Sequence, residues 1–365
     1  MSFSRLGSIA VVAVAASIIL SSCASNEAPA KVDSSSKPTV TYSGTLNGIG
    51  SSAQGAAETA WAAGFQSANS GATINYNPAG SGAGRTAFIA GSADFAGSDA
   101  ALNPTELAAK SPKCAATSSQ LDLPVYISPI AIAFNLPGVK TLKLDAPTIA
   151  GIFKGSITKW DDAAIKSQNS GVTLPSTAIA VVHRADDSGT TQNFTDYLSQ
   201  NAPTVWTAPA AQTFPYKIGD AATGTPGVAA AVKAATGTIA YIDDSGATGM
   251  TVAQLKVGDA YSTISAAGAA DVVAKSPLAA NRAANDLAIA IDRKNTDAKA
   301  WPLVLVSYMI VCQQYSDAAT GKLVTGYATY AASSDGQAAA SKQAGSAPLA
   351  SDLAAKVAKV IATIK

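Results

Sequence analysis

The chain has 365 residues, of which 48% are hydrophobic and 13% are charged, with 25 basic and 24 acidic side chains. Such sparse, balanced charge excludes a protein that binds nucleic acid through a basic surface, and it excludes a highly charged disordered chain. One histidine and three cysteines leave almost no ligands for a metal site, so we expect neither a metal nor a cofactor. The length predicts two domains of ordinary size.

Residues 1–22 have the pattern of a secretory signal peptide. Arg5 precedes an unbroken apolar run over residues 9–20, which is too short to cross a hydrocarbon core of about 30 Å. The run ends in LSSC at residues 20–23, which resembles the lipobox of bacterial lipoproteins. In that family the cysteine is acylated and begins the mature chain, so we expect Cys23 to carry diacylglycerol and palmitate and to anchor the protein to the cell membrane. Cleavage near residues 28–30, with Cys23 discarded, is the alternative.

Residues 23–41 are small and polar and contain proline, which predicts a flexible tether. With Cys23 acylated, Cys114 and Cys312 remain. An exported protein with two further cysteines favours one disulfide between them. Two buried free thiols are the alternative.

In the body of the chain, strand patterns alternate with helix patterns, which predicts the α/β class. Short apolar runs predict strands at residues 73–76, 93–96, 125–135, 179–184, 238–242 and 303–311. Apolar residues at i, i+4 spacing predict helices over 52–69, 190–200 and 348–364, the last capped by Ser351. The four tryptophans are expected to fill cores: Trp61, Trp160, Trp206 and Trp301.

The most informative pattern is a strand, then a turn rich in glycine and hydroxyl side chains, then a helix. It occurs at residues 48–53 (GIGSSA), 77–84 (NPAGSGAG) and 184–190 (RADDSGT). Each turn places free backbone N–H groups and a hydroxyl at a helix N-terminus, where the helix dipole favours an anion. One such turn is weak evidence because serine is a common helix cap. Three of them together predict an oxyanion site.

Two nucleotide-binding motifs are excluded. The first turn fits a dinucleotide fingerprint, but no acidic residue follows at the required spacing of about 20 residues. The sequence also contains no GxxxxGK[ST], so it has no P-loop.

Two charged residues accompany the turns. Arg184 ends a predicted strand and can hold a tetrahedral oxyanion in a bidentate fork. Asp99 ends another; it repels a fully ionised anion but accepts a hydrogen bond from a protonated one. Phosphate is protonated near neutral pH and sulfate is not, so one carboxylate can reject sulfate. Taken singly, each has a structural alternative, a turn cap for Asp99 and a surface ion pair for Arg184.

A secreted serine hydrolase or phosphatase using Ser81 or Ser188 is a competing hypothesis. It needs a general base, and His183, the only histidine, is predicted to point away from Arg184 because neighbouring strand residues face opposite sides. The sequence has no GxSxG elbow. We therefore expect a protein that is not an enzyme and a histidine that packs or lies at the surface.

These residues resemble a known family, the phosphate-binding lipoprotein of the phosphate-specific ABC transporter. Residues 94–102 (DFAGSDAAL) are similar to the family's DFGxSDxPL, residues 151–162 (GIFKGSITKWDD) to IYxGxIxxWDD, and residues 179–190 (IAVVHRADDSGT) to IxVVxRxDxSGT. The resemblance runs from about Leu46 to the C-terminal helix. The chain departs from the pattern at Ala101, where the family has proline, at Asp187, where some relatives have glycine, and in the first turn, where many have threonine and an aromatic residue.

The resemblance implies a type II periplasmic-binding-protein fold whose two lobes close on one phosphate ion about a two-strand hinge. It places lobe one at residues 42–127 and 302–365 and lobe two at 128–301, with hinge crossings near 128–132 and 301–304. It implies a monomer with two partners, phosphate and a membrane permease; a receptor for another oxyanion such as sulfate is the alternative. The phosphate ligands that it implies are Ser52, Ala53, Ser81, Asp99, Arg184, Ser188, Gly189 and Thr190. Asp186 would brace Arg184, and the choice between Ser51 and Ser52 stays open.

Overall fold

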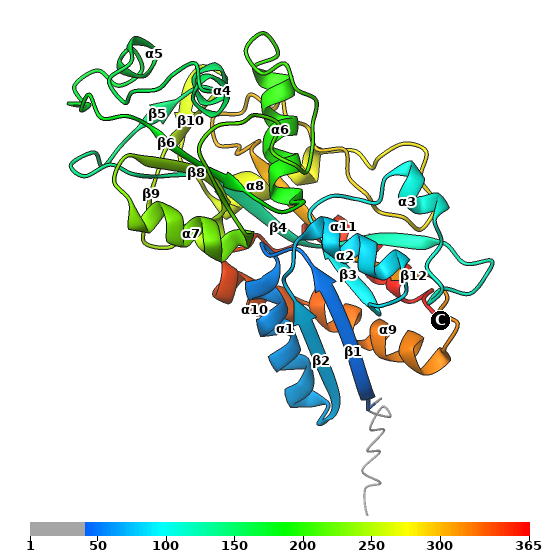
Figure 1. Ribbon diagram of the computed structural model, residues 1–365. Coiled ribbons are helices and arrows are strands. Elements are labelled where there is room, and N and C mark those ends of the chain that lie inside the picture. The colour runs from blue at the N-terminus through cyan, green and yellow to red at the C-terminus, as the bar shows by residue number, and fades with distance from the viewer. Residues whose placement is uncertain (1–40) are drawn as a thin grey trace, which may run out of the picture. The chain divides into compact units, whose positions relative to one another are not determined.

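The structure is a computed structural model that describes residues 41–365. The predicted signal peptide, Cys23 and nearly all of the tether lie outside these described residues. Strands and helices alternate along the described chain, which confirms the α/β class (Figure 1). No helix within residues 41–365 is both long and apolar enough to cross a membrane.

The strands are β1 (Ser43–Gly50), β2 (Gly71–Asn77), β3 (Phe95–Ser98), β4 (Gln120–Asn135), β5 (Lys143–Leu144), β6 (Ala180–Arg184), β7 (Asp220–Ala222), β8 (Thr238–Asp243), β9 (Thr251–Val252), β10 (Gln254–Val257), β11 (Ala260–Ser262) and β12 (Val304–Cys312). The helices are α1 (Gly55–Ala68), α2 (Ser81–Ile89), α3 (Pro104–Ala108), α4 (Ala146–Lys154), α5 (Ala163–Lys166), α6 (Gly189–Asn201), α7 (Gly224–Ala234), α8 (Ala266–Lys275), α9 (Ala318–Ala332), α10 (Ser334–Ala344) and α11 (Ser351–Ile361), with a 3-10 turn η1 (Asp244–Gly246).

One long strand connects two groups of strands. The main sheet has the order β2-β1-β3-β12-β4-β8-β6-β7, with β9 on the side of β4. The first part of β4, Gln120 to Pro129, pairs with β12, and the second part, Ile130 to Asn135, pairs with β8. Strand β4 is therefore continuous between the two lobes: its first part belongs to one lobe and its second part to the other. We call the group of β1, β2, β3 and β12 the first lobe and the group of β6, β7 and β8 the second lobe.

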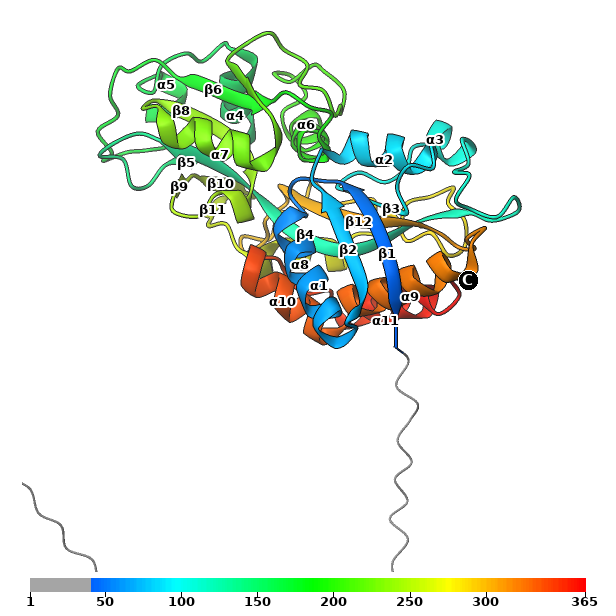
Figure 2. The same cartoon turned by 60° about the horizontal axis from the view of Figure 1, so that its bottom comes forward.

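Helices cover both faces of the first-lobe sheet. Helix α2 lies on one face of β1 and β3, whereas α1, α9, α10 and α11 lie on the opposite face (Figure 2). In the second lobe, α7 packs on β6 and β8, and α6 packs on β8 from its other side together with α4. Both lobes are therefore layers of helix, sheet and helix.

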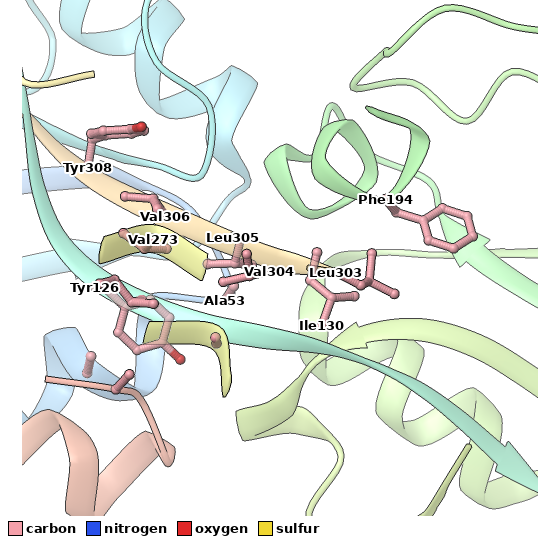
Figure 3. Packing of buried hydrophobic residues seen from close by; sticks show 14 of the residues in the cluster. Ala53, Tyr126, Ile130, Phe194, Val273, Leu303, Val304, Leu305, Val306 and Tyr308 are labelled. Atoms are coloured by element: carbon pink, nitrogen blue, oxygen red, sulfur yellow. The ribbon is translucent and has the colours of Figure 1, made fainter. Parts of the chain in front are cut away.

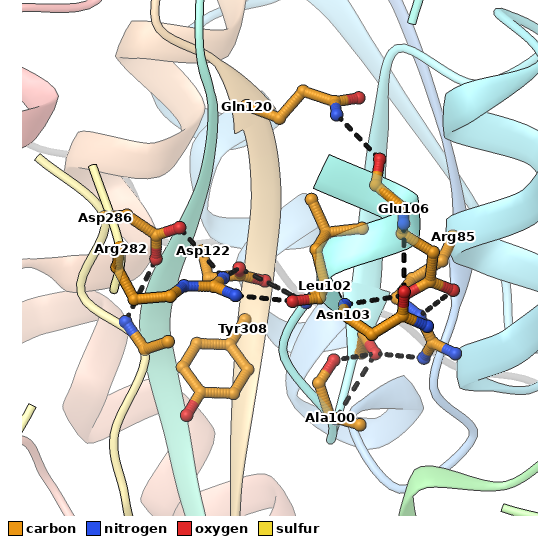
Figure 4. A network of polar contacts seen from close by, with 12 residues as sticks. Arg85, Ala100, Leu102, Asn103, Glu106, Gln120, Asp122, Arg282, Asp286 and Tyr308 are labelled. Atoms are coloured by element: carbon orange, nitrogen blue, oxygen red, sulfur yellow. Dashed lines mark hydrogen bonds and ion pairs between the residues drawn. The ribbon is translucent and has the colours of Figure 1, made fainter. Parts of the chain in front are cut away.

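The connection between α8 and β12 returns across the first lobe. Arg282 donates to the carbonyl oxygen of Leu102 and pairs with the carboxylates of Asp122 and Asp286 (Figure 4). The main-chain N–H of Ile289 donates to the Tyr308 hydroxyl at 3.0 Å. Residues near 282–289 thus contact strands β4 and β12 of the first lobe.

A continuous apolar core runs through the crossing between the lobes. Ile130, Leu303, Leu305 and their neighbours line the place where β4 and β12 run side by side (Figure 3). The four tryptophan side chains are at most 1% exposed, as the sequence predicts. Full burial of such aromatic side chains contributes about 2–3 kcal/mol each.

The predicted elements are present with shifted ends, and one predicted cap is wrong. Strand β3 begins at Phe95, two residues later than predicted, and α1 begins at Gly55 because the turn before it is longer. Helix α11 begins at Ser351, so the N-cap is Ala350, which has no side-chain hydrogen bond. The extended backbone of Ala350, with φ −58° and ψ 147°, sets the start of the helix, and Ser351 already lies in its first turn.

The structure links Cys114, in the loop before β4, to Cys312, at the end of β12, in a disulfide with 5.2 Å between the Cα atoms. In the chain-entropy account, closing a loop of 198 residues stabilises the folded state by about 5 kcal/mol at most. We therefore expect reduction to lower the melting temperature of the ligand-free protein by several degrees. A variant with both cysteines changed to serine should melt at that lower temperature with or without reductant. Equal melting of the untreated and reduced wild type would contradict the linkage.

Candidate anion-binding site

The three turns singled out by the sequence each lie between a strand and a helix. They connect β1 to α1, β2 to α2, and β6 to α6. Strand β1 is parallel to β2, and β6 is parallel to its neighbour β8, so each turn lies at the carboxyl end of a parallel strand. The first turns of α1, α2 and α6 face the region between the lobes (Figure 1). This confirms the predicted strand, turn and helix pattern and brings the three helix N-termini together.

The second and third turns meet at Asp99. The hydroxyl of Ser81 accepts a hydrogen bond from the Asp99 N–H at 3.1 Å, and the hydroxyl of Thr190 donates to Asp99 Oδ2 at 3.2 Å. A Cβ atom added at Gly189 would lie 2.6 Å from both Asp99 Cβ and Ser81 Oγ. A residue without a side chain is therefore required at Gly189, because the first turn of α6 rests directly on Asp99.

The Asp99 carboxyl group is enclosed and only partly satisfied. The residue is 4% exposed, and among residues 41–365 its Oδ1 atom has no hydrogen-bond partner. Burial raises the pKa of Asp99, opposed by the hydroxyls of Ser51, Ser307 and Thr190 and by the charge of Arg184. A buried carboxylate oxygen without a donor is costly, so this geometry suits a ligand that brings its own hydrogen-bond donor.

Arg184 is held by an acidic neighbour. Its Nε atom donates to Asp186 Oδ1 at 2.8 Å, and its Nη2 atom pairs with Asp186 Oδ2. Burial alone would raise the pKa of Asp186, but the hydrogen bonds and charge of Arg184 outweigh it and lower that pKa. Asp186 also accepts from the N–H of Gly224 at 3.0 Å. Within the described part of the chain the pair uses Nε and Nη2 and leaves Nη1 for an anion.

Asp186 lies close to the second turn as well. Gly80 has a φ of 109°, and a Cβ atom placed there would lie 2.5 Å from Asp186 Oδ2. The glycine thus gives the backbone conformation that starts α2 and the space that the Arg184–Asp186 pair occupies. Arg184 is 4% exposed, so its ion pair with Asp186 is buried. The structural alternative, in which Arg184 forms an ion pair at the surface, does not apply.

The first turn is arranged differently from the expectation. The hydroxyl of Ser51 accepts from the N–H groups of Ala53 at 3.1 Å and Gln54 at 3.3 Å, so the Ala53 N–H expected to face a ligand is bonded within the turn. The hydroxyl of Ser52 accepts from the N–H of Thr225 at 2.9 Å. Ser51 therefore caps its own turn, and Ser52 contacts the second lobe.

Ser188 begins α6 as a helix cap. Its hydroxyl oxygen accepts from the N–H of Thr191 at 3.1 Å, and the side chain is fully buried. Because the oxygen accepts, the hydroxyl proton of Ser188 stays available for a ligand. The third turn thus combines a helix N-terminus with a buried hydroxyl donor.

Sequence reasoning missed two parts of the site. Gly224 and Thr225, at the start of α7, supply the N–H groups that hold Asp186 and Ser52. They follow β7 in the same strand, turn and helix order, so that pattern could have found them. Ser307 in the buried strand β12 donates to Gln54 Oε1 at 3.2 Å, and its hydroxyl opposes the rise in the pKa of Asp99. A lone serine in an apolar run is itself a signal.

His183 takes no part in the site. Its ring stacks on Phe214 with 4.2 Å between ring centroids, and its Nδ1 atom lies 2.9 Å from the carbonyl oxygen of Arg184. The expectation of a packed histidine is confirmed. The hydrolase hypothesis is left without its base, because the imidazole is held on Phe214.

Two lobes joined by a shared strand, with helix N-termini facing each other between them, define the class of periplasmic binding proteins, and residues 34–335 match the family described as the PBP superfamily domain. Within that class the chain belongs to the PstS phosphate-binding proteins. It is 38% identical over 287 residues to phosphate-binding protein PstS 3 of Mycobacterium leprae, covering 78% of this chain and 77% of that protein. It is 34% identical over 378 residues to phosphate-binding protein PstS 2 of Mycobacterium tuberculosis, covering both chains completely.

Solved structures show the same fold. The structure of a high-affinity periplasmic phosphate-binding protein (PfluDING) bound with phosphate is 24% identical in sequence and has a TM-score of 0.70. The match covers 86% of this chain and 93% of that one. A phosphate-binding protein from Stenotrophomonas maltophilia is 22% identical, with a TM-score of 0.69 over 87% and 93% of the two chains. The type II fold expected from the resemblance is therefore confirmed.

Proposed function

We propose that this protein binds one inorganic phosphate ion outside the cytoplasm and delivers it to the permease of a phosphate-importing ABC transporter. The observation that carries the proposal is the buried Asp99 carboxyl group beside the Arg184 guanidinium and three helix N-termini. Its Oδ1 atom has no donor among the residues that the structure describes. A hydrogen phosphate ion supplies that donor and accepts from everything else around it. The proposed role is binding and release without catalysis.

The proposed phosphate ligands are those of the family pattern. The carboxylate of Asp99 would accept the phosphate proton, and the free Nη1 of Arg184 would bind the anion while Asp186 orients the guanidinium. The remaining ligands of the family pattern are Ser52, Ala53, Ser81, Ser188, Gly189 and Thr190, which would donate through hydroxyls and N–H groups of the three turns. Of these, the Ala53 N–H donates to the Ser51 hydroxyl at 3.1 Å and would have to leave that bond to reach phosphate. For the first turn we favour the hydroxyl of Ser52. It accepts from the N–H of Thr225 and lies 3.2 Å from the Thr225 hydroxyl, so it can donate to the anion when the Thr225 hydroxyl donates to it.

We further propose that the lobes close about the strands that connect them. The proposed lobes are residues 42–127 with 302–365, and residues 128–301. Supporting this, β4 changes partner between Pro129 and Ile130, and the N–H of Ile130 donates to the carbonyl oxygen of Leu303 at 2.8 Å. Two short strand segments that absorb a rotation are the ordinary form of a hinge.

The proposed location is the outer face of the cell membrane. Acylation of Cys23 would anchor the chain, residues 24–41 would act as the tether, and the body would work as a monomer. The Cys114–Cys312 disulfide fits an oxidising compartment, and both of its residues belong to the proposed lobe one, so it would leave closure free.

The test is calorimetric titration of the wild-type protein with phosphate and with sulfate at neutral pH. We expect phosphate to bind at least a hundredfold more tightly, because ionised sulfate has no proton to share with Asp99 and meets a buried like charge instead. Equal affinity for the two anions would contradict the role of Asp99. Preference for sulfate would favour the alternative of a receptor for another oxyanion.

A further inference from the structure

A single amide side chain in the second lobe crosses to the main chain of Asp99. Asn193 lies in the first half of α6 and is 5% exposed. Its Nδ2 atom donates to the carbonyl oxygen of Asp99 at 2.7 Å and to the carbonyl oxygen of Gly189 at 2.9 Å. One amide group therefore joins the residue that faces the proposed phosphate to the first residue of α6.

Arg293 fixes the orientation of that amide. Its Nη2 atom donates to Asn193 Oδ1. A guanidinium group can only donate, so the amide must present its oxygen to Arg293 and its nitrogen to Asp99. The geometry allows no flipped amide, because flipping would place two donors against each other at Arg293.

Arg293 is itself tied to the start of β12. Its Nη1 atom donates to the carbonyl oxygens of Val304 at 2.6 Å and Pro302 at 3.2 Å, and its Nε atom donates to Asp196 Oδ2 at 2.8 Å. The side chain is 2% exposed. A continuous chain of hydrogen bonds thus runs from Asp99 through Asn193 and Arg293 to the strand segment proposed as the hinge.

The lobes are not closely packed around this chain of bonds. A cavity of about 440 Å³ lies between them there, and Asp99, Asn193, Arg293 and Tyr308 are among its lining residues. Where side chains do not fill the space, directional hydrogen bonds have to hold the two surfaces in register. The contact between Asn193 and Asp99 is such a bond.

We propose that Asn193 is a positioning residue that holds Asp99 in place when the lobes are closed, with Arg293 setting its orientation. This inference rests on the proposed function, since it concerns the lifetime of the closed, phosphate-bound form. The bond to Asp99 joins the two lobes and breaks when they separate, whereas the bond to Gly189 lies within α6 and persists. Loss of the crossing bond should therefore speed release of phosphate and leave its capture unchanged.

The variant that removes the crossing bond is Asn193→Asp, which also removes the bond to the carbonyl oxygen of Gly189 within α6. Aspartate keeps an acceptor oxygen for Arg293 but replaces the donor to Asp99 with a second acceptor, so like partners face each other across the lobes. We expect radiolabelled orthophosphate, chased with unlabelled phosphate, to leave this variant roughly tenfold faster or more than it leaves the wild type. The association rate, from the dissociation rate and the equilibrium constant, should stay within about twofold.

The matched control is Asn201→Asp. Asn201 lies at the end of the same helix, and its Nδ2 atom donates to the carbonyl oxygens of Tyr197 and Arg293 at 3.0 Å, both within the second lobe. The Asn201→Asp variant therefore loses amide-to-carbonyl hydrogen bonds and gains one negative charge, as Asn193→Asp does. Its rate of phosphate release should match that of the wild type. The ligand-free melting temperature of Asn193→Asp should not fall, because the new carboxylate pairs with Arg293.

The possible results separate this inference from the proposed function. Failure of the wild type to bind phosphate would overturn the proposed function. Tight binding by the wild type with wild-type release from Asn193→Asp would overturn only the inference. Slower association with unchanged release, or equal acceleration in Asn201→Asp, would also overturn it, because either result would show an effect on the open form or a general effect of charge.

Discussion

Replacing Arg184 by alanine should weaken phosphate binding roughly a thousandfold, equivalent to about 4 kcal/mol. The change removes the buried guanidinium beside Asp99 and leaves the carboxylate of Asp186 without its ion-pair partner. The anion would then meet two acidic groups without the charge of Arg184. Equilibrium dialysis against orthophosphate measures the loss, and circular dichroism checks that the variant is folded.

Two further variants show what Arg184 contributes. Arg184→Lys keeps the charge but loses the planar fork that engages Asp186 and a ligand together, so we expect an intermediate loss. Lys166→Ala is the control for net charge, because Lys166 is exposed and, within residues 41–365, pairs only with Asp161 at 3.3 Å. Its affinity should equal that of the wild type. Wild-type affinity in Arg184→Ala would contradict the proposed clamp.

Replacing Asp99 by asparagine should change selectivity more than affinity for phosphate. The amide of the variant still offers an oxygen to the phosphate proton, so phosphate binding should change little. Sulfate should bind at least tenfold more tightly than it binds the wild type, equivalent to ~1.4 kcal/mol, because a buried negative charge is replaced by a group that can donate. Calorimetric titration of phosphate and sulfate into the wild type and the variant gives the ratio of the two affinities for each protein.

Replacing Asp99 by asparagine should also remove the pH dependence of sulfate binding. Burial raises the pKa of Asp99, so its carboxyl group takes up a proton at a higher pH than an ordinary aspartate. Once protonated, the wild-type carboxyl group can donate to sulfate. Sulfate affinity of the wild type should therefore rise as pH falls through that pKa, and the affinity of Asp99→Asn should not.

A matched carboxylate lies on the same stretch of chain. Asp94 precedes β3, is 6% exposed, pairs with Lys113 at 2.7 Å and accepts from the N–H of Asn47 at 2.9 Å. Asp94→Asn removes a buried charge that has its own partners away from the turns. Its preference for phosphate over sulfate should equal that of the wild type, and a shift as large as in Asp99→Asn would contradict a specific role for Asp99.

Local patterns in the sequence were enough to find the turns and most of the elements around them. Spacing along one helix face identified Trp61 and Phe65 as core residues, and both are buried. The hydroxyl and glycine turns were visible because a helix N-terminus depends on the few residues that precede it. The wrong cap at Ser351 has the opposite cause, since the preceding backbone set the helix start and the serine side chain did not.

The sequence by itself determined the class of fold and the three turns, and it predicted Asp99 and Arg184 as the charged groups of an oxyanion site, because these follow from residue type and short spacing. Only the tertiary structure decided which groups meet across the lobes: Thr225 with Ser52, and Asn193 with Asp99. The partners in these two contacts are 173 and 94 residues apart in sequence. No local propensity encodes such a contact, since it depends on how the path of β4 between the lobes sets one helix end against the other.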